Sequence, residues 1–153
     1  MSRHVVHEDL VSQAVTGVMS SPAVAIVASA RLGSALTALT RTGLRHLAVV
    51  DGYNRCVGVV ADRAIAAAWA ADPSALERVR VAAVLEPRPA VVGADASVGE
   101  VARVMHTDGV DAVAVIDRTG RPIGLVTGGD LIALMAHHVP AVEDPDRALT
   151  HER

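Results

Sequence analysis

The sequence predicts an α/β (α+β) fold in which two pseudo-symmetric β-α-β-β-α repeats pack as one module. Three observations lead to it. The chain aligns with itself without a gap when it is shifted by 66 positions, so that residues 18–70 match 84–136. Each half alternates short apolar strands with amphipathic helical patterns. At 153 residues the chain is about one domain long, and neither half is expected to cover its apolar surface alone.

The match between the halves is most specific at turn-like positions. Backbone geometry restricts residue choice there, whereas matches among Ala and Val mean little in a chain so rich in both. The matched pairs are Gly33 with Gly99, Gly43 with Gly109, Asp51 with Asp117, Arg55 with Arg121 and Gly58 with Gly124.

The second repeat shows the elements most clearly. It begins with a short strand at 89–92, followed by a helix at 97–109. Ser97 is the expected N-cap with Glu100 three residues later, and Gly109 stands where a C-cap glycine belongs. The remaining elements are expected to be strand 111–117, turn 118–121, strand 122–127 and helix 128–138.

The first repeat is expected to follow the same order, with strand 24–27, helix 31–42, strand 47–51, turn 52–55, strand 56–61 and helix 62–70. The chain then divides into an N-terminal segment 1–13, a first repeat 14–70, a linker 71–80, a second repeat 81–138 and a loose tail 139–153. A leading helix is expected over 8–18, and the linker has helical character that continues to residue 85.

Composition excludes several classes of function. The net charge is −3, all 14 basic residues are Arg, and the only aromatic residues are Tyr53 and Trp69. A nucleic-acid binder would need a basic face or aromatic stacking platforms. No apolar run approaches the length of a membrane span, and the N-terminus lacks a signal-peptide core. Cys56 is the only cysteine, so no disulfide can form within the chain. A cytoplasmic protein is expected.

Patterns of catalysis and metal binding are also missing. The sequence contains no nucleophile elbow, P-loop, dinucleotide fingerprint or zinc-protease motif. Cys56 is interpreted as a strand residue, and His137 and His138 complement the dipole at a helix end. His4, His7, His106 and His151 do not form a metal-binding pattern. We expect neither an enzyme nor a metal site.

One pair of matching octets differs in its polar residues. GLVTGGDL (124–131) contains Thr127 and Asp130, whereas GVVADRAI (58–65) has Ala61 and Ala64 at these positions. A carboxylate at a helix start can accept hydrogen bonds from two vicinal hydroxyls, and a hydroxyl beside Gly128 can help to bind an anion. The same spacing also fits a capping box, in which both side chains only satisfy the helix terminus. The residues alone leave both interpretations open.

The repeated order resembles a tandem pair of CBS (cystathionine-β-synthase) domains, also called a Bateman module. The resemblance covers residues 14–138 and rests on VMSSPAVAIV (18–27), GLRHLAVVD (43–51), VLEPRPAVV (84–92), GVDAVAVID (109–117) and the two octets. It implies a stand-alone regulatory module that binds AMP, ADP or ATP, or in some members S-adenosylmethionine or NAD. It also implies a homodimer and a regulated partner protein, which the sequence does not identify.

The resemblance places the ligand in one cleft between the repeats. In the family the motif's Asp bonds the ribose hydroxyls and its Thr helps with phosphate or ribose, which assigns these roles to Asp130 and Thr127. Basic residues before the second strand reach the phosphates from the other repeat, in a slot that holds Arg45 and His46 here, whereas the commoner order is His-Arg. Gly128 lets the ligand approach the backbone.

The adenine wall and the second cleft follow from the same resemblance. Ala90 and Val91, on the first strand of the second repeat, would supply an apolar wall for adenine. Ala61 and Ala64 would face Asp111 and Ala112, so that this cleft lacks the carboxylate of its motif and carries an acid where phosphate would lie. One cleft is therefore expected to bind and the other to have lost its site.

Two hypotheses follow. In the first, the module binds one adenine nucleotide and signals its presence to a partner. AMP is favoured over ATP because Arg45 and His46 are the only basic residues expected near the phosphates. In the second, it is a non-liganded CBS dimerisation or interaction module, and Thr127 and Asp130 are caps. Helix 62–70, with Ile65 and Trp69 one turn apart, is expected either at the dimer interface or buried within the pair.

Overall fold

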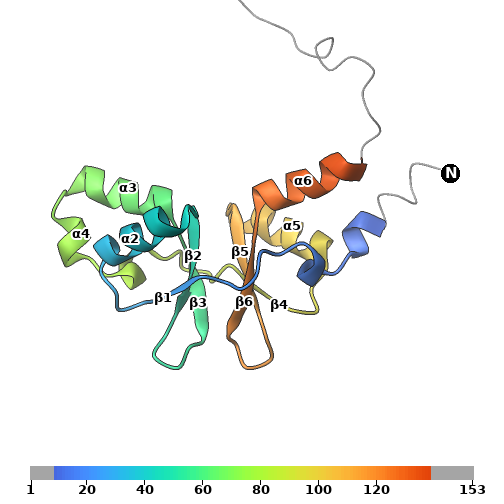
Figure 1. The fold of residues 1–153 in the computed structure, drawn as a ribbon, viewed down its shortest axis with the longest axis horizontal. Helices are drawn as coiled ribbons and strands as arrows, with labels where there is room; N and C mark the ends of the chain where they lie inside the picture. The colour runs from blue at the N-terminus through green and yellow to red at the C-terminus, as the bar shows by residue number, and fades with distance from the viewer. Residues whose placement is uncertain (1–8, 139–153) are drawn as a thin grey trace, which may run out of the picture.

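The computed structural model describes residues 9–138 and contains two similar halves (Figure 1). The first half comprises η1 (Val15–Gly17), β1 (Ala25–Val27), α2 (Leu32–Thr42), β2 (His46–Val50), β3 (Cys56–Ala61), α3 (Asp62–Ala71) and α4 (Ala75–Arg78). The second comprises η2 (Val81–Val84), β4 (Val91–Gly93), α5 (Val98–Asp108), β5 (Ala112–Ile116), β6 (Pro122–Thr127) and α6 (Gly128–His138). The predicted tail 139–153 lies outside the described residues.

The two sheets have the same topology and register. In each, the first strand pairs in parallel with the second, which pairs antiparallel with the third, giving the orders β1-β2-β3 and β4-β5-β6. Ala25 pairs with Ala48, and 66 positions later Val91 pairs with Ala114. Both hairpins also carry a register irregularity at the same place. The predicted repeat is confirmed at the level of individual strand pairs.

Helix ends follow the predicted capping signals in the second repeat. The Ser97 hydroxyl accepts a hydrogen bond from the backbone N–H of Glu100 at 3.2 Å, which fixes the start of α5. Gly109 ends this helix with a φ of 64°, and Gly43 ends α2 with a φ of 71°. Both positions need the left-handed backbone conformation that glycine adopts without steric cost.

Two expected elements are wrong in extent. The leading helix predicted over 8–18 is a helical segment at 9–12 followed by η1, because Ala14 forms a bridge with Ser97 and interrupts it. The strand predicted at 89–92 is β4, which begins at Val91. Pro89 has no backbone N–H, and its carbonyl accepts a hydrogen bond from Val91 N, so the chain turns before it joins the sheet.

The segments that precede β1 and β4, which we call the leading segments, are exchanged between the two halves. Val15 is fully buried in the core of the second half, and its N–H donates to Ala96 O. Val81, 66 positions later, is fully buried in the core of the first half, and its N–H donates to Ala30 O. Each half therefore completes its core with a segment that precedes the other half's first strand.

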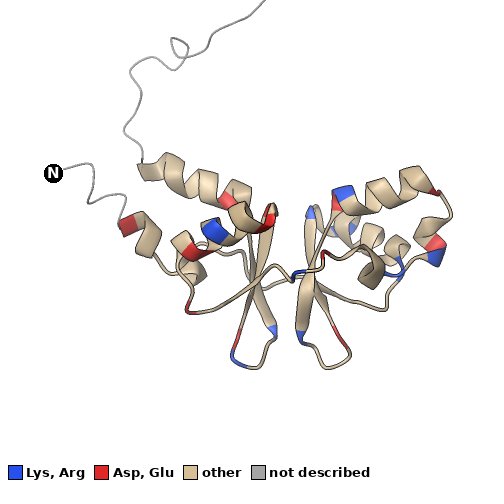
Figure 2. Cartoon of the chain, turned by 180° about the vertical axis from the view of Figure 1, so that it is seen from behind, with Lys and Arg blue, Asp and Glu red and all other residues tan. Residues whose placement is uncertain are grey.

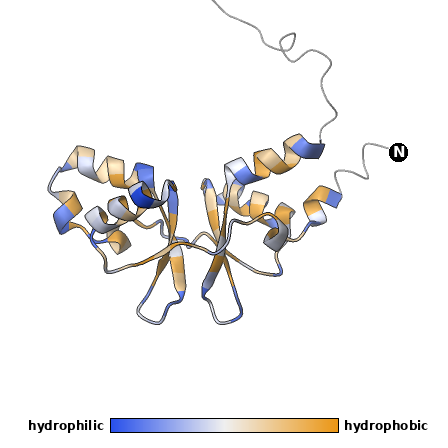
Figure 3. Cartoon of the chain, viewed as in Figure 1, coloured by the Kyte–Doolittle hydropathy of each residue, from blue (hydrophilic) through white to orange (hydrophobic). Residues whose placement is uncertain are grey.

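The two sheets pack against each other through small side chains. Ala48, Ala114 and Leu125 form a buried cluster between them, with Cys56 and Val59 packed at its edge. Alanine on both sides lets the strands come close, and Figures 1 and 3 show the two sheets meeting at the centre with the helices outside. Between residues 9 and 138, no helix is long and apolar enough to cross a membrane.

Candidate functional site: two clefts between the repeats

The larger cleft lies where α6 begins, and we call it the Thr127 cleft. Its volume is about 540 Å³, within the range of small-molecule sites. Both halves contribute to it, because the exchanged segment before β1 and the loop before β2 meet the motif of the second half. The lining residues are Ser20, Ser21, Pro22, Ala23, Val24, Gly43, Leu44, Arg45, His46, Asp111, Leu125, Thr127, Gly128 and Gly129.

Thr127 and Asp130 form a reciprocal capping box. Asp130 Oδ2 accepts a hydrogen bond from Thr127 N at 2.8 Å, and Thr127 Oγ1 accepts one from Asp130 N at 3.2 Å. The capping interpretation from sequence is therefore realised in the structure. No described residue contacts the second carboxylate oxygen, Oδ1, through a hydrogen bond or ion pair, so one acceptor of Asp130 is not used by the cap.

Arg45 and His46, the expected phosphate contacts, line this cleft, and each already has an acidic partner. Arg45 Nε lies 3.1 Å from Asp62 Oδ2, with the arginine side chain 78% exposed. His46 Nε2 lies 3.1 Å from Asp111 Oδ1, and its side chain is only 12% exposed. Figure 2 shows basic and acidic residues side by side where α3 begins.

Asp111 joins the two halves. Its carboxylate contacts His46 and also Arg63 Nη2, at 3.4 Å, while its backbone carbonyl accepts a hydrogen bond from Gly128 N at 2.8 Å. Partial burial of the Asp111 carboxyl opposes its ionisation. The hydrogen bond to His46 and the charges of His46 and Arg63 outweigh this cost and lower its pKa.

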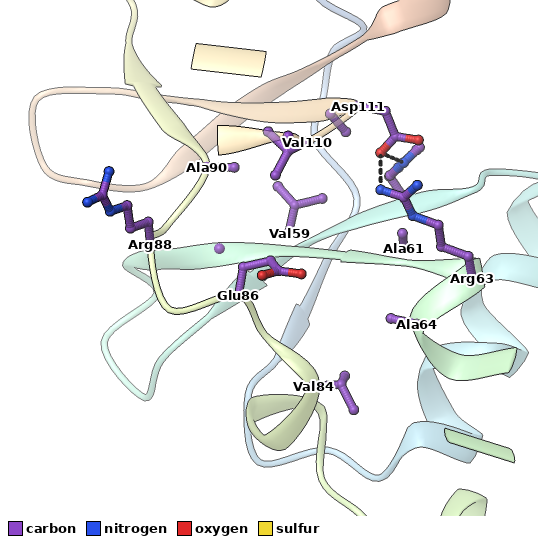
Figure 4. Close-up of a pocket in the computed structure, with 14 residues that line it drawn as sticks. Val59, Ala61, Arg63, Ala64, Val84, Glu86, Arg88, Ala90, Val110 and Asp111 are labelled. Atoms are coloured by element: carbon purple, nitrogen blue, oxygen red, sulfur yellow. Dashed lines mark hydrogen bonds and ion pairs between the residues drawn. The ribbon is translucent and has the colours of Figure 1, made fainter. Parts of the chain in front are cut away.

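The smaller cleft, which we call the Ala61 cleft, is its pseudo-symmetric counterpart (Figure 4). Its volume is about 80 Å³. Ala61 and Ala64 hold the motif positions and face Asp111 and Ala112, the arrangement predicted from the sequence. Arg63 reaches Asp111 along one side. The lining residues are His46, Gly58, Val59, Ala61, Arg63, Ala64, Val84, Glu86, Arg88, Ala90, Gly109, Val110, Asp111 and Ala112.

Two predicted site residues lie elsewhere, and a third, Asp130, caps α6 beside the cleft without being one of its lining residues. Ala90 lines the Ala61 cleft, and Val91 packs against the alanine cluster between the sheets. The reason is the exchange of leading segments, which brings the segment before β4 to the motif of the first half. The matching residue of Ala90 in the Thr127 cleft is Val24, with Ser20 and Ser21 beside it. Sequence reasoning missed these residues, although the 66-residue alignment pairs Val24 with Ala90.

The other candidates have structural surroundings. Burial raises the pKa of the Cys56 thiol, whose Sγ lies 3.4 Å from Gly58 O, so it is a poor nucleophile. Ile65 is buried in the core of the first half, whereas Trp69, one turn later, is 52% exposed. Within the described part of the chain no group of three or more metal-binding side chains occurs.

Comparison with known proteins identifies the family of these repeats. The model of the CBS domain matches residues 15–71 and again 81–137. A CBS domain-containing protein of Dictyostelium discoideum is 29% identical over 113 residues, which span 68% of this chain and 78% of that protein.

Two solved structures extend the comparison. One is a CBS domain pair in complex with 5′-methylthioadenosine and S-adenosyl-L-methionine, with a TM-score of 0.72 and 22% identity, covering 82% of this chain and 97% of the other. The second is the cytosolic domain of the Mg²⁺ channel MgtE in complex with ATP, with a TM-score of 0.66 and 29% identity. It covers 80% of this chain, which spans only 49% of that domain.

Proposed function

The chain belongs to the CBS domain family, and from this premise we propose that it is a regulatory module rather than an enzyme. It binds one adenine nucleotide in the Thr127 cleft and signals occupancy to a partner protein in the cytoplasm. The observation that carries the proposal is the composite make-up of this cleft. The Thr127 hydroxyl comes from one repeat, next to the Asp130 carboxylate with which it forms the capping box, and two basic side chains come from the other repeat.

We propose a pose for the ligand. The ribose hydroxyls donate to Asp130 Oδ1, the acceptor that the capping box does not use, while Oδ2 keeps its bond to Thr127 N. The phosphate lies toward Arg45 and His46. Adenine packs against the aliphatic side chains that line the cleft, Val24, Leu44 and Leu125.

The two solved relatives support an adenosine ligand. One holds 5′-methylthioadenosine and S-adenosyl-L-methionine, and the MgtE domain holds ATP. All three molecules carry an adenosine group and differ in what is attached to its 5′ position. A cleft built to hold adenine and ribose is therefore the feature we transfer to this chain.

Ligand binding in this cleft can change how the two repeats pack, and this change is the proposed signal. Because the lining residues come from both repeats, the ligand contacts both and favours the packing of the repeats that suits it best. Such differential affinity for two arrangements is what a sensor requires. The alternative is a non-liganded interaction module, in which Thr127 and Asp130 act only as caps.

Calorimetric titration of the chain with AMP separates these functions, with Asp130→Asn as the site variant. An asparagine can keep the cap through its side-chain carbonyl oxygen, but its NH2 group cannot accept hydrogen bonds from the ribose hydroxyls. We expect one site per chain in the wild type and loss of at least tenfold in affinity, or about 1.4 kcal/mol, in the variant. Glu100→Gln, on α5 outside both clefts, is the control for the lost charge. Saturable AMP binding with equal affinity in Asp130→Asn would place the ligand elsewhere.

We also propose that the module is a homodimer formed through α3 and α6. These equivalent helices extend along the same side of the module (Figure 1), and both expose apolar side chains. Trp69 is 52% exposed on α3, and Ile132 and Met135 are 62% and 46% exposed on α6. Light scattering is expected to give a dimer for the wild type and a monomer for Ile132→Glu. A wild-type monomer at high concentration would contradict this assembly.

A further inference from the structure

Asp111 has a position that the sequence comparison of the two clefts does not anticipate. The sequence assigns it to the Ala61 cleft, yet it lines the Thr127 cleft as well. Its backbone carbonyl accepts the hydrogen bond from Gly128 N at 2.8 Å and so fixes the residue beside the start of α6. The side chain is 54% exposed, and its carboxylate contacts His46, which also lines this cleft.

This carboxylate competes with a ligand phosphate for the same basic groups. His46 Nε2 lies 3.1 Å and Arg63 Nη2 lies 3.4 Å from Asp111 Oδ1. Arg63 lines the Ala61 cleft rather than the Thr127 cleft. Arg45, the other basic residue that lines the Thr127 cleft, is paired with Asp62 at 3.1 Å. A phosphate that enters must therefore displace a carboxylate from a cation that is already paired.

The charge at the phosphate end of the cleft limits how many phosphates it can accept. Among its lining residues, Arg45 and Asp111 carry opposite charges, and His46 is held by Asp111. One phosphate can be accommodated by exchanging partners with Asp111. Each further phosphate adds negative charge beside the Asp111 carboxylate without meeting another basic side chain of the lining, and this repulsion weakens binding.

We propose that Asp111 is a specificity-determining residue of the Thr127 cleft, which selects adenosine ligands with at most one phosphate over diphosphates and triphosphates. The inference rests on the proposed function and narrows it to one class of ligand. Asp111 acts by holding His46 and by repelling additional phosphates, while adenine and ribose are bound by other residues of the cleft.

Calorimetric titrations of the whole chain with adenosine, AMP, ADP and ATP test this selection. EDTA is present so that Mg²⁺ does not neutralise the phosphates. In the wild type we expect AMP to bind at least tenfold more tightly than ATP. In Asp111→Asn we expect ATP to gain about tenfold in affinity, which corresponds to about 1.4 kcal/mol, while adenosine changes less than twofold. Glu100→Gln controls for the change in net charge. The comparison of the four ligands in the wild type does not depend on the folding of any variant.

The outcomes distinguish this inference from the function on which it rests. Wild-type binding of ATP as tight as that of AMP would overturn the selection and leave the adenosine site intact. An unchanged ratio of AMP to ATP affinity in folded Asp111→Asn would remove Asp111 as its cause. Failure of all four ligands to bind the wild type would overturn both the inference and the proposed function.

Discussion

Replacing Asp130 tests how capping and ligand binding share one side chain. Asp130→Ala removes the acceptor for Thr127 N, which donates to Oδ2 at 2.8 Å. Loss of a side chain that caps a helix start costs about 1 kcal/mol, within a range of about 0.5–2. For a chain of this length, 1 kcal/mol corresponds to a decrease of about 2–4 °C in Tm. Asp130→Asn keeps an acceptor, so we expect its Tm to fall by less than half as much.

Differential scanning calorimetry without ligand measures the capping contribution, and the same scans with AMP measure the ligand contribution. At 100 times its Kd, AMP stabilises the wild type by about 2.7 kcal/mol. We expect both variants to lose about half of this stabilisation or more, as a loss of at least tenfold in affinity requires, although only Asp130→Ala loses the cap. The two variants should therefore differ in Tm both with and without AMP, and AMP should raise the Tm of each by the same small amount.

Two results would refute this reasoning. If Asp130→Ala melts at the wild-type temperature without ligand, the hydrogen bond at 2.8 Å contributes nothing to the stability of α6. If Asp130→Asn keeps the full stabilisation by AMP, the unused carboxylate oxygen is not a ligand contact. In the second case Thr127 and Asp130 would be only a capping box.

Two further predictions concern stability. Because the pKa of Asp111 is lowered in the folded state, its ionised form stabilises the fold above its unfolded-state pKa of about 4. This contribution is lost as pH falls through the folded-state pKa, so acid titrations monitored by circular dichroism should be shallower for Asp111→Asn; identical titrations would contradict it. Gly124→Ala should cost about 1–3 kcal/mol in urea melts, because its Cβ would lie 3.0 Å from Ser20 O, whereas Gly52→Ala, which meets no atom within 4 Å, is the control. Equal costs would contradict the crowding at Gly124.

Local elements were predictable where a single residue type determines the backbone. Ser97 and Gly109 mark the two ends of α5 in the sequence, and the structure confirms both caps. The first strand of the second repeat begins later than predicted because Pro89 turns back to bond Val91 N, so the first bond to the sheet is the one that Ala90 O accepts from Ala114 N. Strand propensity alone does not reveal that turn, since Ala90 and Val91 are compatible with a strand that begins at either Pro89 or Val91.

The exchange of leading segments was not predictable from the pattern of apolar residues. Val15 and Val81 are equivalent apolar residues 66 positions apart, and each is fully buried, so the apolar pattern does not say which core each one joins. This choice of partner decides which cleft receives Ala90 and which receives Val24. Arg45 and His46 line the Thr127 cleft, and they were candidates because the resemblance implies that basic residues come from the other repeat.

The first repeat shows what the fold requires of the octet and what it does not. Ala61 gives α3 no side-chain cap, and Asp62 Oδ1 accepts a hydrogen bond from Arg63 N at 2.7 Å instead. Ile65 is as well buried there as Leu131 is in α6. The fold therefore tolerates a helix start without the Thr and Asp pair. Folding alone does not require Thr127 and Asp130 in the second repeat, which favours a ligand as the second reason for their presence.

The double variant Ala61→Thr/Ala64→Asp tests this argument directly. It installs the capping box on α3, and we expect a gain of about 1 kcal/mol in the free energy of unfolding, measured in urea. We expect AMP stoichiometry to remain at one per chain, because the Ala61 cleft has a volume of only about 80 Å³ and Asp111 stands where the phosphate would lie. Two equal sites in calorimetry would contradict this, because the motif alone, rather than its setting between the repeats, would then create the site.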